Sequence, residues 1–175
     1  IFTGENMLLE TYQHRSFIKQ SGNILTTLRS RETPFEIGWN TEIRAYEWLR
    51  QQYQRHRVRL NRQHALIWAW PQSTISYPTV PHTDRRVAIV HLWLDVPDEL
   101  VLLMNFEAWT IPLIGARFME DDNIPIERDW EKLFDEAWLI QHEYAASDDW
   151  LDHQAVFPYV DRAWIKRIKY LRGYR

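Results

Sequence analysis

The sequence predicts a mixed α+β domain, and three observations lead to this fold class. Strand-like and helix-like stretches follow in the order strand, helices, strands, helices, strands, unlike the regular alternation of a doubly wound α/β protein. Residues 86–103, RVAIVHLWLDVPDELVLL, are mainly apolar at both alternating sets of positions up to Leu94, as expected for a central strand buried on both faces. The length of 175 residues suits one domain with a sizeable core. Residues 1–6 carry no pattern and precede Met7, so we expect a remnant or a disordered start there and a single domain over 7–175.

The other elements are expected around this central strand. Pro97 and Asp98 end it in a turn, after which residues 101–103 resume extended geometry. Further strands are predicted at 8–13, 65–70, 154–160 and 163–171, the last of them interrupted at Ile165 and Lys166. Helices are predicted at about 40–56 and 125–140, helical turns at 14–20 and 106–111, and a loop at 72–85.

The composition favours a cytoplasmic protein without a membrane partner. The chain has no cysteine, which excludes disulfides, thiolate nucleophiles and zinc–thiolate sites and fits a reducing compartment. No apolar run reaches the roughly 20 residues that a membrane span requires, and no signal peptide is visible. Ten tryptophans suit core packing and also permit an aromatic-lined cleft.

Basic residues gather in the first half of the chain. Residues 1–90 hold 12 Lys and Arg against 7 Asp and Glu, whereas residues 91–175 hold 9 against 17. Six arginines lie on and after the predicted helix 40–56, with tyrosines and a tryptophan among them: Arg44, Arg50, Arg55, Arg57, Arg59 and Arg62. Such a stretch could bind phosphates or single-stranded nucleic acid, and the same composition is typical of a solvated helix face.

Motifs for several common chemistries are absent from the sequence. The five glycines form no phosphate-binding loop, and there is no nucleophile elbow. His142-Glu143 lacks the second histidine of a metalloprotease helix and the seven histidines show no ligand spacing, so no metal is expected. His91, in the central strand, is interpreted as a hydrogen-bonded core imidazole or, alternatively, as a base.

Short motifs along most of the chain occur in a recognisable order. They are Trp68-Ala69-Trp70, Val96-Pro97-Asp98-Glu99, Val101-Leu102-Leu103, Trp109, Ile126-Glu127, Trp130-Glu131, Leu133-Phe134-Asp135, Gln154-Ala155 and Trp164-Ile165-Lys166. Together they resemble a bacterial family known as domain of unknown function 3841, over the span from Leu8 to Leu171. The segment Thr11-Tyr12-Gln13 departs from the pattern expected at the start of that family. The family name implies no activity.

The run Gln154-Ala155-Val156-Phe157-Pro158 also resembles the start of a late strand in the ADP-ribosyltransferase superfamily. This resemblance implies a split β-sandwich of two small mixed or antiparallel sheets flanked by helices, with NAD as co-substrate in the cleft between the sheets. It further implies that Thr11 and Gln13 bind the nicotinamide end of NAD and that Trp68 or Trp70 stacks on its ring. Gln154 would then hydrogen-bond the nicotinamide ribose.

The chemistry of nicotinamide departure limits what these residues could do. The departure leaves an oxocarbenium-like ribose, so the site must stabilise spreading charge and hold the sugar hydroxyls. Because glutamine cannot ionise, Gln154 could only hold the sugar hydroxyls, and a proton would have to be taken up by Asp152 or by a base of the substrate. Structural interpretations stand beside these roles: Gln154 could cap a strand end, Trp68 and Trp70 could form a core indole pair, and Thr11 and Gln13 could belong to a solvated edge strand.

The sequence therefore leads to two classes of function. One is an NAD-dependent ADP-ribosyltransferase-like enzyme that passes ADP-ribose to a macromolecular acceptor, either a protein or a nucleic acid. The other is a non-enzymatic interaction or nucleic-acid-binding module, in a phage, defence or toxin setting, that uses its tryptophans and basic helix to dock a partner.

Overall fold

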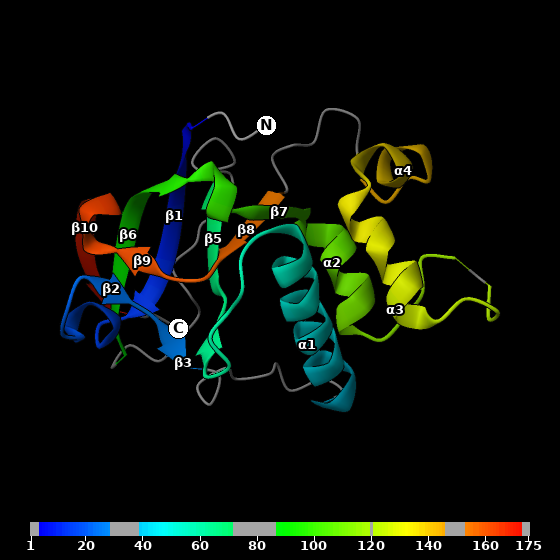
Figure 1. The fold of residues 1–175 in the computed structure, drawn as a ribbon, viewed down its shortest axis with the longest axis horizontal. Coiled ribbons are helices and arrows are strands. Elements are labelled where there is room, and N and C mark those ends of the chain that lie inside the picture. The colour runs from blue at the N-terminus through cyan, green and yellow to red at the C-terminus, as the bar shows by residue number, and fades with distance from the viewer. Residues whose placement is uncertain (1–3, 29–38, 72–86, 120, 146–152, 173–175) are drawn as a thin grey trace.

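The computed structural model describes residues 4–28, 39–71, 87–119, 121–145 and 153–172. Strands occupy one side of the molecule and helices α1 to α4 the other (Figure 1). Helices and strands are both present and the sheets are antiparallel, which confirms the predicted α+β class.

The main sheet has six strands in the order β10-β6-β1-β5-β8-β7, and each neighbouring pair is antiparallel. Their bounds are β1 Asn6–His14, β5 Ile67–Pro71, β6 Ala88–Pro97, β7 Leu102–Asn105, β8 His153–Phe157 and β10 Ile165–Arg172. The predicted central strand is β6, which lies between β10 and β1. Val90, Leu92 and Leu94 on one of its faces and His91 on the other are buried, so the prediction of burial on both faces is confirmed at these positions.

Two hydrophobic clusters lie on opposite faces of the sheet. The first packs α1 (Trp39–His56) and α2 (Phe106–Leu113) against β7 and β8, and the second is covered by the 3₁₀ turn η1 (Phe17–Lys19). Strand β8 shows the alternation directly, since Val156 belongs to the first cluster and Ala155 and Phe157 to the second. Several of the tryptophans fill the first cluster, as predicted for most of them, with Trp48 and Trp130 nearly inaccessible.

Two short ribbons complete the strands. They are β2 (Ile24–Leu25) with β9 (Val160–Asp161), and β3 (Thr27–Leu28) with β4 (His64–Ala65). The predicted strand 154–160 is thus divided into β8 and β9, because Pro158 has no backbone N–H to donate to a ladder. In β10 the register shifts between Ile165 and Arg167, which matches the predicted interruption.

The predicted helix 125–140 is wrong as a single element. The segment forms α3 (Ile126–Asp129), the 3₁₀ turn η5 (Trp130–Phe134) and α4 (Glu136–Gln141). The break falls at Asp135, whose backbone leaves helical geometry and whose side chain accepts a hydrogen bond from the amide of Trp138 (3.0 Å). A residue that caps the following helix cannot also continue the preceding one.

The start of the sheet lies before Met7. Asn6 opposes Pro97 in the β1–β6 ladder, and the amide of Asp98 donates to the carbonyl of Glu5 (3.1 Å). Glu5 and Asn6, which the sequence analysis assigned to an unpatterned start, therefore take part in the folded structure. Residues 1–3 and the predicted loop 72–85 lie outside the described residues.

Candidate nucleotide-binding cleft

Strands β1 and β5 are joined over a short length and then diverge. Among the described residues, their ladder contains only the pairs Leu9–Pro71 and Glu10–Trp70, whereas β1 pairs with β6 along all of its nine residues. Beyond the ladder the hydroxyl of Thr11 donates to the carbonyl of Trp68 (2.6 Å), so the two strands are linked here by a side-chain hydrogen bond. The sheet therefore opens between its first strand and β5.

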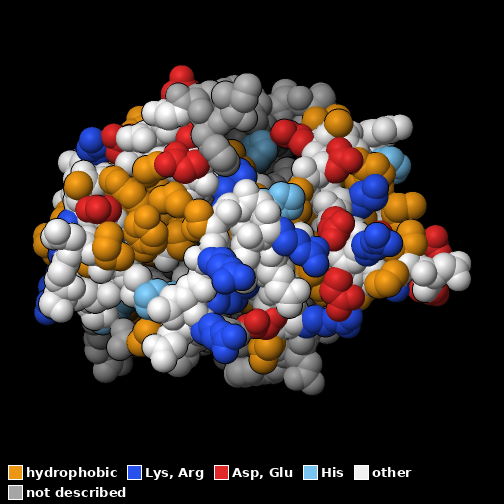
Figure 2. All heavy atoms as spheres, in the orientation of Figure 1, with side chains coloured by type: hydrophobic (Ala, Val, Ile, Leu, Met, Phe, Trp, Pro, Cys, Tyr) orange, Lys and Arg blue, Asp and Glu red, His pale blue; other side chains and the backbone are white. Residues whose placement is uncertain are grey.

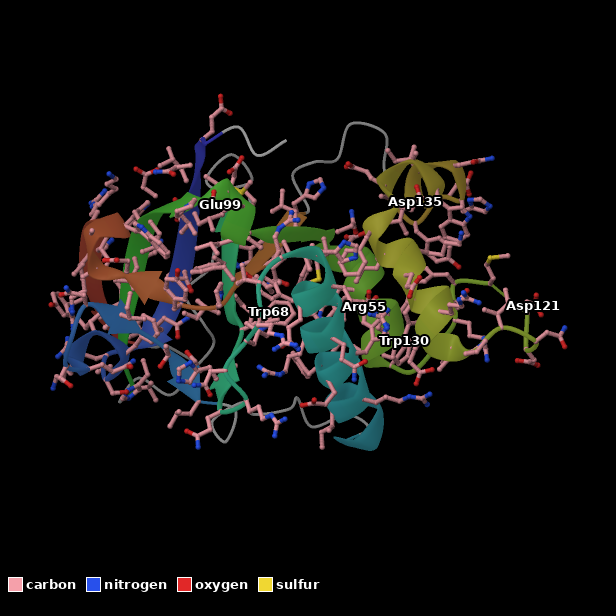
Figure 3. All side chains as sticks on the ribbon, in the orientation of Figure 1. Arg55, Trp68, Glu99, Asp121, Trp130 and Asp135 are labelled. Carbon is pink, nitrogen blue, oxygen red and sulfur yellow. The ribbon has the colours of Figure 1, made fainter. Side chains whose placement is uncertain are left out.

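A cavity of about 270 Å³ lies at this opening. Residues from β1, β3, α1, β5 and the turn before β5 line it: Tyr12, Gln13, Thr27, Tyr46, Leu66, Ile67 and Trp68. Figure 3 shows Trp68 between β5 and α1, on the side of the strand that faces the helices. Aromatic rings and apolar chains with a few polar groups are the usual lining of a small-molecule site.

A chain of hydrogen bonds fixes the polar side of this cavity. Nε2 of Gln13 donates to Oγ1 of Thr11 (2.9 Å), which in turn donates to the carbonyl of Trp68. Thr11 is only 1% exposed, so this relay is shielded from water. The amide nitrogen of Gln13 is thereby engaged, and the amide oxygen remains without a donor among the described residues.

Trp68 connects the cavity to the hydrophobic cluster under α1. Its indole meets Tyr46 edge to face (ring centroids 5.7 Å apart) and lies against Trp109 at the same separation. Trp68 is only partly buried, so part of the ring remains at the cavity wall. The indole of Trp68 therefore packs against the hydrophobic cluster and also lines the cavity.

The structure does not bring Gln154 into this cavity. Gln154 lies in β8 opposite Met104, is 9% exposed, and is not among the described residues that line the cavity. By strand alternation it shares a face with Trp70, which packs on Phe106 (4.9 Å), whereas Thr11 and Gln13 project to the opposite face of the sheet. Asp152 lies outside the described residues.

A buried carboxylate next to the cleft was not predicted from the sequence. Glu10 accepts hydrogen bonds from Nε2 of His91 (2.8 Å) and from the indole of Trp93 (2.9 Å), so both of its oxygens are engaged. The imidazole is stacked on the ring of Tyr12 (ring centroids 4.2 Å apart) and lies tilted against the ring of Trp93 (3.6 Å). A glutamate in the apolar strand 8–13 was the only signal, and its partners lie 81 and 83 residues away in the chain.

Burial lowers the pKa of His91, and the nearby Lys169 and Arg167 act in the same direction. Glu10 opposes this effect through its hydrogen bond and its charge without reversing it. The imidazole is therefore mainly neutral at pH 7, and its Nε2–H donates to the carboxylate. This agrees with the interpretation of His91 as a hydrogen-bonded core residue.

The basic stretch of α1 is largely occupied by contacts within the protein. Arg44 pairs with Glu127, and Nε of Arg57 donates to the carbonyl of Val101 (2.7 Å). Arg50 is buried and donates to two backbone carbonyls. Figure 2 shows the Lys and Arg side chains over α1 interspersed with Asp and Glu side chains over the neighbouring helices. This arrangement favours the solvated, structural interpretation of these arginines.

A second hollow of about 360 Å³ lies between α1 and η5. Arg55, which lines it, pairs with Glu131 (3.4 Å), and Asp135, which also lines it, caps α4. Figure 3 labels both residues. These charged side chains already make contacts within the protein, so the cleft between β1 and β5 is the better candidate for a ligand-binding site.

Within the described residues, no group of three or more His, Asp and Glu side chains is placed to hold a metal ion. None of the helices in the described segments is long and apolar enough to cross a membrane. No protein-family model matches the sequence, and no curated protein or solved structure shows significant similarity to it.

Proposed function

We propose that this protein binds NAD, with the nicotinamide end in the cavity between β1 and β5, and transfers ADP-ribose to a protein or nucleic acid. The observation that carries the proposal is the divergence of β1 and β5 after two residue pairs, which opens an aromatic-lined cavity inside a sheet. The resemblance to ADP-ribosyltransferases implies NAD in a cleft between two small sheets, whereas this cavity opens between two neighbouring strands of one six-stranded sheet. Thr11, Gln13 and Trp68, three of the residues singled out in the sequence, meet there.

The cavity suits one end of a dinucleotide. Its volume of about 270 Å³ falls just below the roughly 300–1,000 Å³ of sites that enclose a drug-sized ligand. Trp68 supplies a ring on which nicotinamide stacks, and the oxygen of Gln13 accepts a hydrogen bond from its carboxamide. The rest of NAD extends out of the cavity.

The transfer breaks the bond between nicotinamide and C1′ of the ribose, and nicotinamide leaves as a neutral ring. A nucleophile of the acceptor forms a new bond to C1′ and gives up its proton to a base. In this proposal Gln154 holds the ribose hydroxyls from the Trp70 side of the sheet, and Asp152, two residues earlier, takes the proton. Gln154 then acts on the part of NAD that lies outside the cavity.

The test compares the NAD-induced rise in melting temperature between the natural protein and four variants, one of which is a control. A ligand at 100 times its Kd stabilises the native state by about 2.7 kcal/mol, so binding is readily seen. We expect Trp68→Leu to weaken NAD binding about 2- to 12-fold through lost stacking, and Trp68→Phe to restore part of it. Gln13→Leu should weaken it about fivefold through the lost hydrogen bond.

Trp138→Leu, on α4, is the matched control and should leave the NAD-induced shift unchanged. Each shift is measured from the variant's own melting temperature, so a loss of stability is not mistaken for a loss of binding. Incubation with labelled NAD and a cell extract then separates binding from transfer, because Gln154→Ala should abolish labelling of the acceptor. An absence of any shift at millimolar NAD in the natural protein contradicts the proposal.

A further inference from the structure

We infer that the outer strand β10 forms a binding surface for single-stranded nucleic acid. We call it the β10 surface and define it by six residues: Arg15, Trp93, Arg167, Ile168, Lys169 and Tyr170. It is separate from the arginines of α1 and from the cavity between β1 and β5. The inference does not depend on the proposed function.

Strand β10 is the edge of the six-stranded sheet (Figure 1). Its successive side chains point to opposite faces of the sheet. It pairs with β6, and residues 166–170 are all exposed. Tyr170 is 56% exposed and Ile168 39%, on one face, while Arg167 and Lys169 project from the other. An extended ligand could therefore run along this edge and reach both kinds of side chain.

Most of the basic residues of the β10 surface have no acidic partner within the described parts of the chain. The strand IKRIKYLR contains four basic residues and no acidic one. Lys166 pairs with Asp95 (2.9 Å), but Arg15, Arg167 and Lys169 form no ion pair among the described residues. Glu10, the carboxylate beneath them, is already bonded through both oxygens to His91 and Trp93.

The cations of this surface lie on aromatic rings. The guanidinium of Arg167 is 4.6 Å from the centre of the Trp93 ring, and that of Arg15 is 4.9 Å from the centre of the Tyr170 ring. A guanidinium that stacks on a ring keeps its N–H groups directed outward in the ring plane, where a phosphate oxygen can accept them.

This combination of rings and unpaired cations matches the chemistry of a single strand of nucleic acid. Aromatic side chains stack on unpaired bases, and Lys and Arg neutralise the phosphates between them. Protection of a sheet edge against other strands explains basic residues on β10, but it does not require them to lie on rings. A duplex would satisfy the cations and leave Tyr170 without a base to stack on.

The experiment measures the affinity of a fluorescently labelled 12-nucleotide single strand by anisotropy at several salt concentrations. Arg167→Gln with Lys169→Gln should reduce the salt slope of log K by about 1.4, since each phosphate contact to a single strand contributes about 0.7. Tyr170→Leu should weaken binding about 5- to 150-fold through lost base stacking, with little change in that slope.

The charge-matched control is Arg59→Gln with Arg62→Gln, which removes two cations near α1 and should leave affinity within about twofold. The Tyr170 variant exchanges an exposed side chain, so circular dichroism and the melting temperature should match those of the natural protein. Any one of the following results would overturn the inference: no binding at 50 mM salt, an equal loss in the control, or an equal affinity for duplex of the same length. Binding that Tyr170→Leu does not weaken would also overturn it, because the rings would then play no part.

Discussion

Replacing Thr11 by valine tests the hydrogen-bond relay that shapes the cleft. Valine keeps the volume and the branched shape of threonine, so the change removes the hydroxyl alone. Two bonds are lost, the one from Gln13 and the one to the carbonyl of Trp68, at a position that is 1% exposed. Each is worth about 0.5–1.5 kcal/mol net, and buried groups left without partners add to this, so we expect a total of about 2–3 kcal/mol.

The loss is measured as the change in the free energy of unfolding by urea denaturation. For a protein of this size, about 2–3 kcal/mol corresponds to a fall in melting temperature of about 4–12 °C. The matched control is Thr110→Val, because the hydroxyl of Thr110 donates to the carbonyl of Glu107 on the exposed side of α2 (2.6 Å) and should cost less than about 0.5 kcal/mol. An equal loss in both variants would refute the reasoning that the hydroxyl of Thr11 takes part in a buried network of hydrogen bonds.

Two further predictions concern stability alone. Burial lowers the pKa of His91 in the folded protein, so the unfolded chain takes up a proton first as the pH falls, and the free energy of unfolding should decrease as the pH drops from 7 through 6.5. His91→Gln should flatten this part of the plot of unfolding free energy against pH. A plot that the substitution leaves unchanged would contradict the assignment of this pH dependence to His91. Asp135→Ala removes the N-cap of α4 and should lower the free energy of unfolding, measured by urea denaturation, by about 0.5–2 kcal/mol. Asp135→Asn keeps a capping oxygen and should retain most of the stability. Equal losses in the two variants would mean that Asp135 does not act as the cap.

The strands were predictable from the sequence because their patterns are local. The alternation around β6 indicated burial on both faces, and the interruption at Ile165 appeared as a register shift in β10. The helix 125–140 could not be divided in advance, since apolar residues recur at helical spacing across its whole length. Whether Asp135 caps a new helix or continues the old one depends on backbone angles that the spacing does not specify.

The candidate site was predictable only in part, for a related reason. Thr11 and Gln13 share a face of β1 by alternation, and the structure joins them by a hydrogen bond. The contact between Thr11 and Trp68 depends on the order of strands in the sheet, which the sequence pattern does not fix. The same holds for Glu10 and His91, which meet because β1 and β6 are neighbours at one particular register.

The position of Gln154 also follows from strand order and register. Its strand, β8, lies beyond β5 as seen from β1, and its side chain shares a face with Trp70. A role for Gln154 in NAD binding therefore requires the ligand to extend from the cavity toward Trp70.

The most direct test of the cleft between β1 and β5 is a nuclear magnetic resonance titration with nicotinamide. The side-chain amide of Gln13 and the indole N–H of Trp68 are separate reporters on two walls of the cavity. We predict that both signals shift together with one dissociation constant, while the indole signal of Trp138 on α4 does not move. Shifts confined to other residues, or none at millimolar nicotinamide, would contradict the claim that this cavity holds the nicotinamide end of NAD.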